Sequence, residues 1–205
     1  MQALIERSRR PGAAYVVSHV FSDRADAAGL NTARDLGIPA RALPCRKDAD
    51  RTAYDVALAG AIAECSPSLI ALAGFMRILT AQFLQRFEGK ILNIHPSLLP
   101  KYPGLHTHRR AIEAGDKEHG ATVHFVTDQL DGGPRIIQAR VAIAADDTEA
   151  SLGDRVLAQE HRIYPLAVSW FSEGRLRHEA GRAWMDGQPL SEPVQLNDIE
   201  PDASP

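Results

Sequence analysis

The sequence is poor in cysteine and has no excess of positive charge, and each shortage excludes a class of protein. Of its 205 residues only Cys45 and Cys65 are cysteines, too few for a disulfide framework, so we expect a reducing, cytoplasmic setting. The formal net charge of −3 provides no basic stripe for nucleic acid. No apolar run approaches the roughly 20 residues of a membrane span, and the first ten residues lack a signal peptide's apolar core. We therefore expect neither nucleic acid nor a membrane as a partner.

Two common phosphate-binding patterns are also absent. Neither Gly-x-Gly-x-x-Gly nor the P-loop pattern occurs in the sequence, so a simple dinucleotide-binding enzyme is not supported. A doubly wound domain normally opens with a strand whose turn into the first helix binds phosphate. This chain instead opens in what is predicted to be a helix over residues 2–10. Two interpretations stay open: the fold begins with a helix, or a first strand and its phosphate-binding turn are missing.

Apolar strand-like segments and amphipathic helix-like segments alternate along the rest of the chain. This alternation predicts an α/β domain, a doubly wound and mostly parallel sheet with helices on both faces. We expect one catalytic domain over residues 1–186 and an acidic, Pro-rich, loose tail over residues 187–205. The expected strands cover residues 14–21, 40–43, 68–73, 90–95, 122–127 and 134–143. The expected helices after the first cover residues 24–36, 51–65, 107–114 and 148–173, with a further short helix after a loop at residues 74–80.

The most informative segment is the strand Lys90–His95, which ends in a polar pair. Because strand side chains alternate, Asn93 and His95 share one face, and Pro96 cannot continue the ladder. An amide and an imidazole side by side at the end of a strand can donate to an oxygen that becomes negative during a reaction. Taken alone, the pair could equally be a satisfied polar strand end.

A carboxylate further along the chain favours the catalytic interpretation. Asp131 stands in a Leu-Asp-Gly-Gly-Pro turn that could bring it to His95. A carboxylate there favours the charged imidazolium, which donates better, and could accept a proton from an attacking amine.

Four other histidines invite a metal hypothesis. His106, His108, His119 and His124 include one His-x-His spacing, but no cysteine cluster or paired carboxylate motif accompanies them. We expect loop or solvent-facing histidines and no metal.

Three long segments of the sequence are distinctive: Leu72–Leu79, Leu92–His108 and Gly120–Pro134. They resemble glycinamide ribonucleotide formyltransferases, the folate-dependent enzymes of purine synthesis. The similarity extends from Met1 to about Gly187 and includes Gln159–His161 and Tyr164–Leu166. The resemblance implies a Rossmann-like formyltransferase fold and formyl transfer from 10-formyltetrahydrofolate to the amine of 5'-phosphoribosylglycinamide. It implies small-molecule partners only, no metal, and a monomer or weak homodimer.

The resemblance also assigns residues. It implies that Asn93, His95 and Asp131 are the catalytic trio and that Glu160 holds the glycinamide substrate. The edge of a helix's buried face is the plainer interpretation of Glu160. The family's Gly-Ser-Asn phosphate turn has no counterpart here, which favours a missing first strand. The expected folate contacts, largely through backbone, are Arg51, Met76, Arg77, Ile78, Leu79, Asn93, Thr127, Asp128, Gln129, Leu130 and Asp131.

Three alternatives to this activity remain at the level of the sequence. A 10-formyltetrahydrofolate hydrolase is expected to carry a second histidine directly after the catalytic one, where this chain has Pro96. A methionyl-tRNA formyltransferase is expected to carry a further C-terminal domain. An inactive folate-binding remnant would bind folate without binding glycinamide ribonucleotide.

Overall fold

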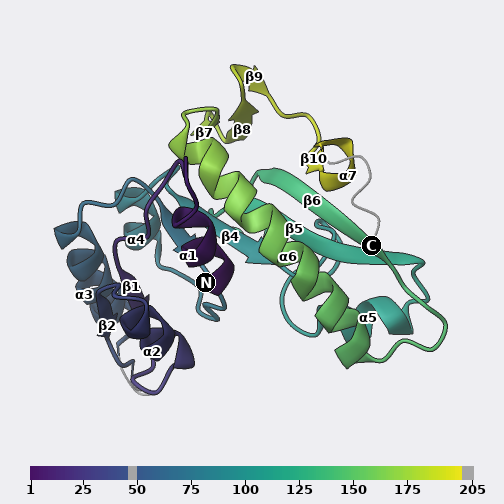
Figure 1. Cartoon of the computed structure of the whole chain (residues 1–205), viewed down its shortest axis with the longest axis horizontal. Helices are drawn as coiled ribbons and strands as arrows, with labels where there is room; N and C mark the ends of the chain where they lie inside the picture. Colours follow the sequence, from purple (N-terminus) through teal and green to yellow (C-terminus); the bar gives the residue numbers. More distant parts are fainter. Residues whose placement is uncertain (46–49, 200–205) are drawn as a thin grey trace. The chain divides into compact units, whose positions relative to one another are not determined.

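The chain folds as two compact units. The computed structural model describes residues 1–45 and 50–199 (Figure 1). The first unit contains residues 1–68 and 77–88, and the second contains residues 69–76 and the chain from Gly89 onward. This division does not coincide with the boundary that we predicted at residue 187, and each unit is described by itself.

In its described residues the first unit contains a small parallel sheet and four helices. β1 (Val20–Ser22) pairs in parallel with β2 (Ala40–Ala42). The core of this unit includes the buried residues Ile5, Ala33 and Ile38, and Val20 packs against them. The helices are α1 (Gln2–Ser8), α2 (Ala28–Asp35), α3 (Arg51–Glu64) and α4 (Ala81–Arg86).

Two local predictions in this unit are wrong. Residues 14–19 are not a strand; β1 overlaps only the last two residues of the predicted segment 14–21 and continues to Ser22. The next helix begins after Ala27, later than the predicted residue 24, and has no side-chain cap. The hydroxyl of Ser22 instead accepts from the backbone N–H of Arg24 at 3.1 Å, a local turn that competes with helix capping.

The second unit is built on a five-stranded mixed sheet in the order β10-β6-β5-β4-β3. β3 (Ile70–Leu72) and β4 (Ile91–His95) are parallel, whereas β5 (Glu118–Phe125) runs antiparallel to both β4 and β6 (Arg135–Ala142). A short turn rather than a crossover helix joins β5 to β6, and such a turn requires antiparallel strands. β3 is one edge of this sheet and β10 is the other.

One long helix covers the central strands of this sheet. α6 (Glu149–Ser172) contacts β4, β5 and β6, and the ribbon runs along them in Figure 1. This helix buries an apolar stripe at helical spacing, and all five members are at most 8% exposed. These residues are Leu152, Val156, Ile163, Ala167 and Trp170.

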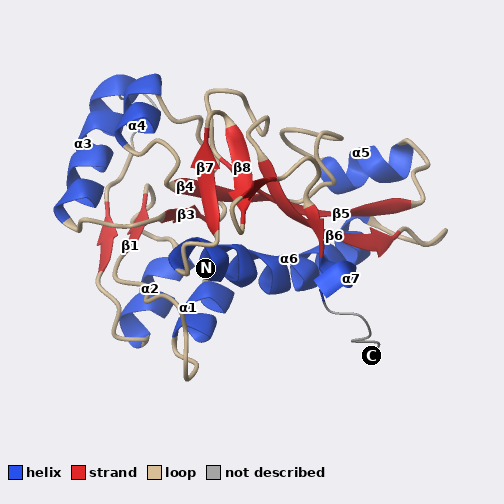
Figure 2. Ribbon diagram, turned by 90° about the horizontal axis from the view of Figure 1, so that it is seen from above, coloured by secondary structure: helices blue, strands red, loops and turns tan. Residues whose placement is uncertain are grey.

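The end of the described chain is not the loose tail that we predicted. β7 (Leu176–Glu179), β8 (Arg182–Met185) and β9 (Gln188–Pro189) form a separate antiparallel sheet, whose first two strands are labelled in Figure 2. β10 (Val194–Gln195) then pairs with β6, and α7 (Leu196–Ile199) follows. Burial of Leu196, which is 1% exposed, anchors this segment to the sheet. Residues 200–205 of the predicted tail lie outside the described residues.

Candidate active site

The carboxyl end of β4 presents Asn93 and His95 on one face of the sheet. The strand forms because Ile91 and Leu92 are buried, and its ladder ends before Pro96, which has no N–H. Asn93 is half-buried and His95 is 6% exposed. The predicted arrangement of this pair is confirmed, since β5 pairs opposite both residues.

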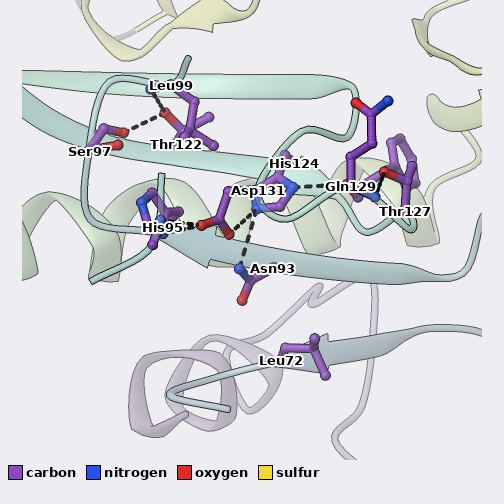
Figure 3. Close-up of polar contacts among 12 residues, drawn as sticks. Leu72, Asn93, His95, Ser97, Leu99, Thr122, His124, Thr127, Gln129 and Asp131 are labelled. Carbon is purple, nitrogen blue, oxygen red and sulfur yellow. Dashed lines mark hydrogen bonds and ion pairs between the residues drawn. The ribbon is translucent and has the colours of Figure 1, made fainter. Parts of the chain in front are cut away.

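Asp131 meets this pair from the turn between β5 and β6. Its Oδ2 lies 3.4 Å from Nδ1 of His95, and both side chains are less than 10% exposed (Figure 3). Asp131 has φ +50, a left-handed conformation that aspartate tolerates better than most residues. Two residues on, a Cβ at Gly133 would lie 1.9 Å from the carbonyl oxygen of Phe125, so the turn needs glycine there.

Both ring nitrogens of His95 face acceptors. Nε2 lies 2.9 Å from the carbonyl oxygen of Tyr102, and Nδ1 faces the Asp131 carboxylate. A carbonyl oxygen only accepts, so Nε2 carries a proton. A doubly protonated ring satisfies both acceptors. From the sequence we expected a ring N–H of His95 to donate to a substrate oxygen. In this structure both ring nitrogens of His95 face protein acceptors instead.

The loop after β4 is held by a buried threonine on β5. The hydroxyl of Thr122 donates to the carbonyl oxygen of Ser97 at 2.6 Å and accepts from the backbone N–H of Leu99 at 3.1 Å. Gln138 on β6 donates to the same hydroxyl at 2.9 Å. Thr122 is fully buried, so these bonds are shielded from water and fix the path of the chain that leaves His95.

A fourth polar residue, His124, joins this site, although the sequence favoured a loop or solvent-facing position for it. His124 is 2% exposed, and its Nε2 lies 3.3 Å from Nδ2 of Asn93 and 3.8 Å from Oδ1 of Asp131 (Figure 3). Burial lowers the pKa of His124 below its ordinary value of 6.5, against the opposing effect of the Asp131 carboxylate. The register of the antiparallel β4–β5 pair, which sets His124 opposite Asn93, is the feature that could have identified this residue.

The predicted folate loop lies next to this cluster. Residues 127–131 lead into the Asp131 turn, and Asp128, Gln129 and Leu130 are exposed. The backbone N–H of Gln129 donates to the hydroxyl of Thr127 at 3.4 Å. The loop therefore places the apolar side chain of Leu130 at the surface.

The other predicted folate contacts are mostly in the first unit. There the guanidinium of Arg51 donates to the carbonyl oxygen of Ile78, and the guanidinium of Arg77 lies 4.7 Å from the centre of the Tyr54 ring. Leu79 is buried, whereas Ile78 is 54% exposed. Met76, which ends the short segment belonging to the second unit, is 80% exposed.

Glu160 projects from α6 and has no hydrogen bond to Asn93, His95 or Asp131. Burial raises the pKa of Glu160 from 4.5 to about 7. Burial disfavours the charged form of this carboxyl group, and a positively charged ligand beside it would favour that form, as the role implied by the sequence resemblance requires.

Residues 1–45 and 50–199 contain no group of three or more histidine, cysteine or acidic side chains arranged to hold a metal ion. His108 and His119 instead hydrogen-bond to each other at 3.1 Å. Within the same described ranges, no helix combines the length and the apolar character needed to cross a membrane.

Comparison with known proteins identifies the class to which this fold and site belong. The Formyl transferase family matches residues 1–168, and the chain belongs to that family. The chain is 52% identical over 190 residues to phosphoribosylglycinamide formyltransferase of Escherichia coli (strain K12), covering 93% of this chain and 90% of the relative. It is 43% identical to the enzyme of the same name from Haemophilus influenzae, covering 97% and 93%.

Solved structures agree with this assignment. The phosphoribosylglycinamide formyltransferase from Coxiella burnetii, in complex with CHES, superimposes with a TM-score of 0.88 at 44% identity, covering 94% of this chain and 92% of that one. Glycinamide ribonucleotide transformylase 1 from Symbiobacterium toebii gives a TM-score of 0.86 at 46% identity, covering 90% and 87%. The predicted α/β formyltransferase fold is confirmed, and the chain is a formyltransferase.

Proposed function

We propose that this enzyme transfers a formyl group from 10-formyltetrahydrofolate to the amine of 5'-phosphoribosylglycinamide, a step of de novo purine synthesis, with Asn93, His95 and Asp131 as its catalytic residues. The names of the full-length relatives support the reaction. The observation that carries the proposed site is the 3.4 Å approach of Asp131 to His95, two residues beyond Asn93 on the same strand face.

The hydrogen-bond donors of the site fit a reaction in which an amine receives a formyl group. The folate cosubstrate supplies a carbonyl whose carbon the amine attacks and whose oxygen gains negative charge. The amide Nδ2 of Asn93 has two hydrogens, one directed to His124 and a second for which the described residues hold no acceptor. That second N–H can donate to the oxygen as its charge grows, and one such donor is typically worth about 10²–10³ in rate.

The His95–Asp131 pair supplies positive charge and a proton acceptor. His95 donates through Nε2 to the carbonyl oxygen of Tyr102, and its Nδ1–H faces Asp131. As an imidazolium it favours negative charge on a nearby oxygen without giving up its proton. The Asp131 carboxylate can accept the proton that the amine must lose, directly or through water, and general base help of this kind is commonly worth about 10²–10⁴.

We also propose which residues bind the folate and the glycinamide substrate. The proposed folate contacts of the second unit are Met76 and Thr127–Asp131, largely through backbone groups, and those of the first unit are Arg51 and residues 77–79. Glu160 would hold the glycinamide amine. No metal takes part. We further propose a cytoplasmic enzyme that acts on small molecules as a monomer or weak homodimer, a state that sedimentation equilibrium measures.

Steady-state assays with the purified chain test the proposal. Wild-type protein should formylate phosphoribosylglycinamide, and Asn93→Ala should lower kcat by about 10²–10³ while changing KM for the folate by less than about threefold. Formyl release to water at the same rate without the glycinamide substrate would instead identify a hydrolase. Folate binding in a calorimeter, with no binding of phosphoribosylglycinamide, would identify an inactive remnant and overturn the proposal.

A further inference from the structure

His124 stands directly opposite Asn93 in the antiparallel pair of β4 and β5, so both side chains project from the same face of the sheet. Their closest polar atoms, Nε2 of His124 and Nδ2 of Asn93, are 3.3 Å apart, as Figure 3 shows. His124 is 2% exposed, so water does not replace this contact. No other side-chain hydrogen bond of Asn93 occurs within the described ranges.

The second ring nitrogen of His124 fixes which way this hydrogen bond runs. Nδ1 lies 2.9 Å from the carbonyl oxygen of Phe125. The carbonyl can only accept, so Nδ1 carries the proton, and in the neutral ring Nε2 is a bare acceptor. Asn93 must then present its NH₂ group, not its carbonyl oxygen, to His124.

The orientation of this amide decides whether Asn93 can serve the reaction. The two ends of an asparagine amide have nearly the same shape, and a turn of the amide by half a revolution exchanges donor and acceptor. In the orientation set by His124, the second N–H of Nδ2 is available to an oxygen that becomes negative. In the reversed orientation Oδ1 would face that oxygen and repel it.

We propose that His124 is a positioning residue that holds the Asn93 amide in its donating orientation. This inference rests on the proposed catalytic role of Asn93. The neutral ring is needed for this function, because a protonated Nε2 would face Nδ2 of Asn93 with a second donor. The ionisable groups that face His124 are Asp131, whose Oδ1 is 3.8 Å from Nε2, and His95.

Substitutions of His124 by glutamine and by asparagine test the roles of its two ring nitrogens separately. His124→Gln places a carbonyl oxygen near the position of Nε2 and can still accept from Asn93. His124→Asn is shorter, places its polar group near Nδ1, and cannot reach Asn93. We expect His124→Asn to lower kcat by about 10- to 100-fold with KM for both substrates within about threefold, and His124→Gln to recover most of the loss.

Val123→Ala is the matched control for general damage to the strand. Val123 is fully buried on the opposite face of β5, so the substitution leaves a cavity without touching the amide. It should lower the melting temperature and keep kcat. Equal kcat losses in His124→Asn and His124→Gln, or a loss of the same size in Val123→Ala, would mean that His124 acts only through packing and would overturn the inference.

A double-mutant cycle with Asn93→Ala distinguishes this inference from the proposed function. If His124 acts through Asn93, His124→Asn should add almost no loss of kcat in the Asn93→Ala background. Additive losses, or wild-type kcat in His124→Asn beside a slow Asn93→Ala, would overturn the positioning role and leave the proposed function standing. Wild-type kcat in Asn93→Ala would overturn both. If His124→Asn does not fold, His124→Phe, which keeps a ring without an acceptor, should show the same kcat loss.

Discussion

The carboxylate of Asp131 accepts a hydrogen bond from the backbone N–H of Gly104 at 2.8 Å, through the same Oδ2 that faces His95. Asp131 thus joins the loop after β4 to the turn after β5. Gly104 has φ +79, a conformation that glycine adopts without strain. The Asp131 side chain therefore contributes negative charge to the site and also holds the loop after β4 in place.

Substitutions at Asp131 should separate these two contributions. Asp131→Asn keeps an oxygen for the N–H of Gly104 but loses the negative charge, so kcat should fall by about 10²–10⁴ with folate affinity little changed. Asp131→Ala removes the acceptor as well and should also lower the melting temperature. Assays and calorimetry with folate measure both effects. Comparable losses of turnover and folate affinity in Asp131→Asn would remove Asp131 from the chemical step.

Tyr164 should be a major contributor to the stability of the second unit. Its hydroxyl lies 2.8 Å from the carbonyl oxygen of Leu72 and 2.9 Å from that of Leu92, at β3 and β4. Tyr164→Phe would remove the donor that the part-buried carbonyl of Leu72 and the buried carbonyl of Leu92 share, and should lower the free energy of unfolding by about 1–3 kcal/mol.

Tyr54→Phe is the comparison for that measurement. The hydroxyl of Tyr54 is only part-buried and has one carbonyl partner, Leu43. Urea unfolding of both variants should show the larger loss for Tyr164→Phe, and an equal or smaller loss there would contradict the buried bridging role.

Acid should destabilise the protein through His119. Burial lowers the pKa of this histidine from 6.5 to about 4, and the pKa of its partner His108 is lowered in the same direction. The folded state therefore disfavours the proton that the unfolded chain accepts. The stability contributed by neutral His119 is complete above about pH 6.5 and is lost as the pH falls toward about 4, a loss on the order of 2–3 kcal/mol.

His119→Gln, which does not titrate, should reduce this dependence on pH. The variant should be less stable than the wild type at pH 8, where it loses only packing and hydrogen bonding, and the difference should shrink by pH 5. Guanidinium unfolding at both pH values measures it. A difference that stays constant would show that His119 is not the titrating group.

Glu160 should show the opposite dependence on pH. Because its pKa is raised to about 7, the folded state binds a proton more tightly than the unfolded chain does. The stability associated with its protonated form is complete below about pH 4.5 and is lost as the pH rises through about 7. Glu160→Gln should therefore melt at a higher temperature than the wild type at pH 8 and at a similar temperature at pH 4.5.

The same variant tests the proposed role of Glu160 in substrate binding. Glu160→Gln should weaken binding of phosphoribosylglycinamide while folate affinity is kept, a gain in stability at the expense of function. Unchanged affinity for phosphoribosylglycinamide would assign Glu160 to the helix alone.

Features that depend only on residues close together in the sequence could be predicted from the sequence alone. The buried stripe of α6 follows from helical periodicity, and the shared face of Asn93 and His95 follows from the alternation of a strand. Pro96 marks the end of β4 because proline has no N–H to donate. These features depend on neighbouring residues only, so local pattern was sufficient.

Contacts between distant segments were decided only by the tertiary structure. The direction of β5 sets His124 opposite Asn93, and hydrophobic pattern alone does not distinguish parallel from antiparallel partners. The pairing of β10 with β6 was equally invisible, because a short polar segment becomes a strand only when a sheet edge is present to pair with it. Sequence therefore named the catalytic candidates, whereas the fold determined which hydrogen bonds orient them.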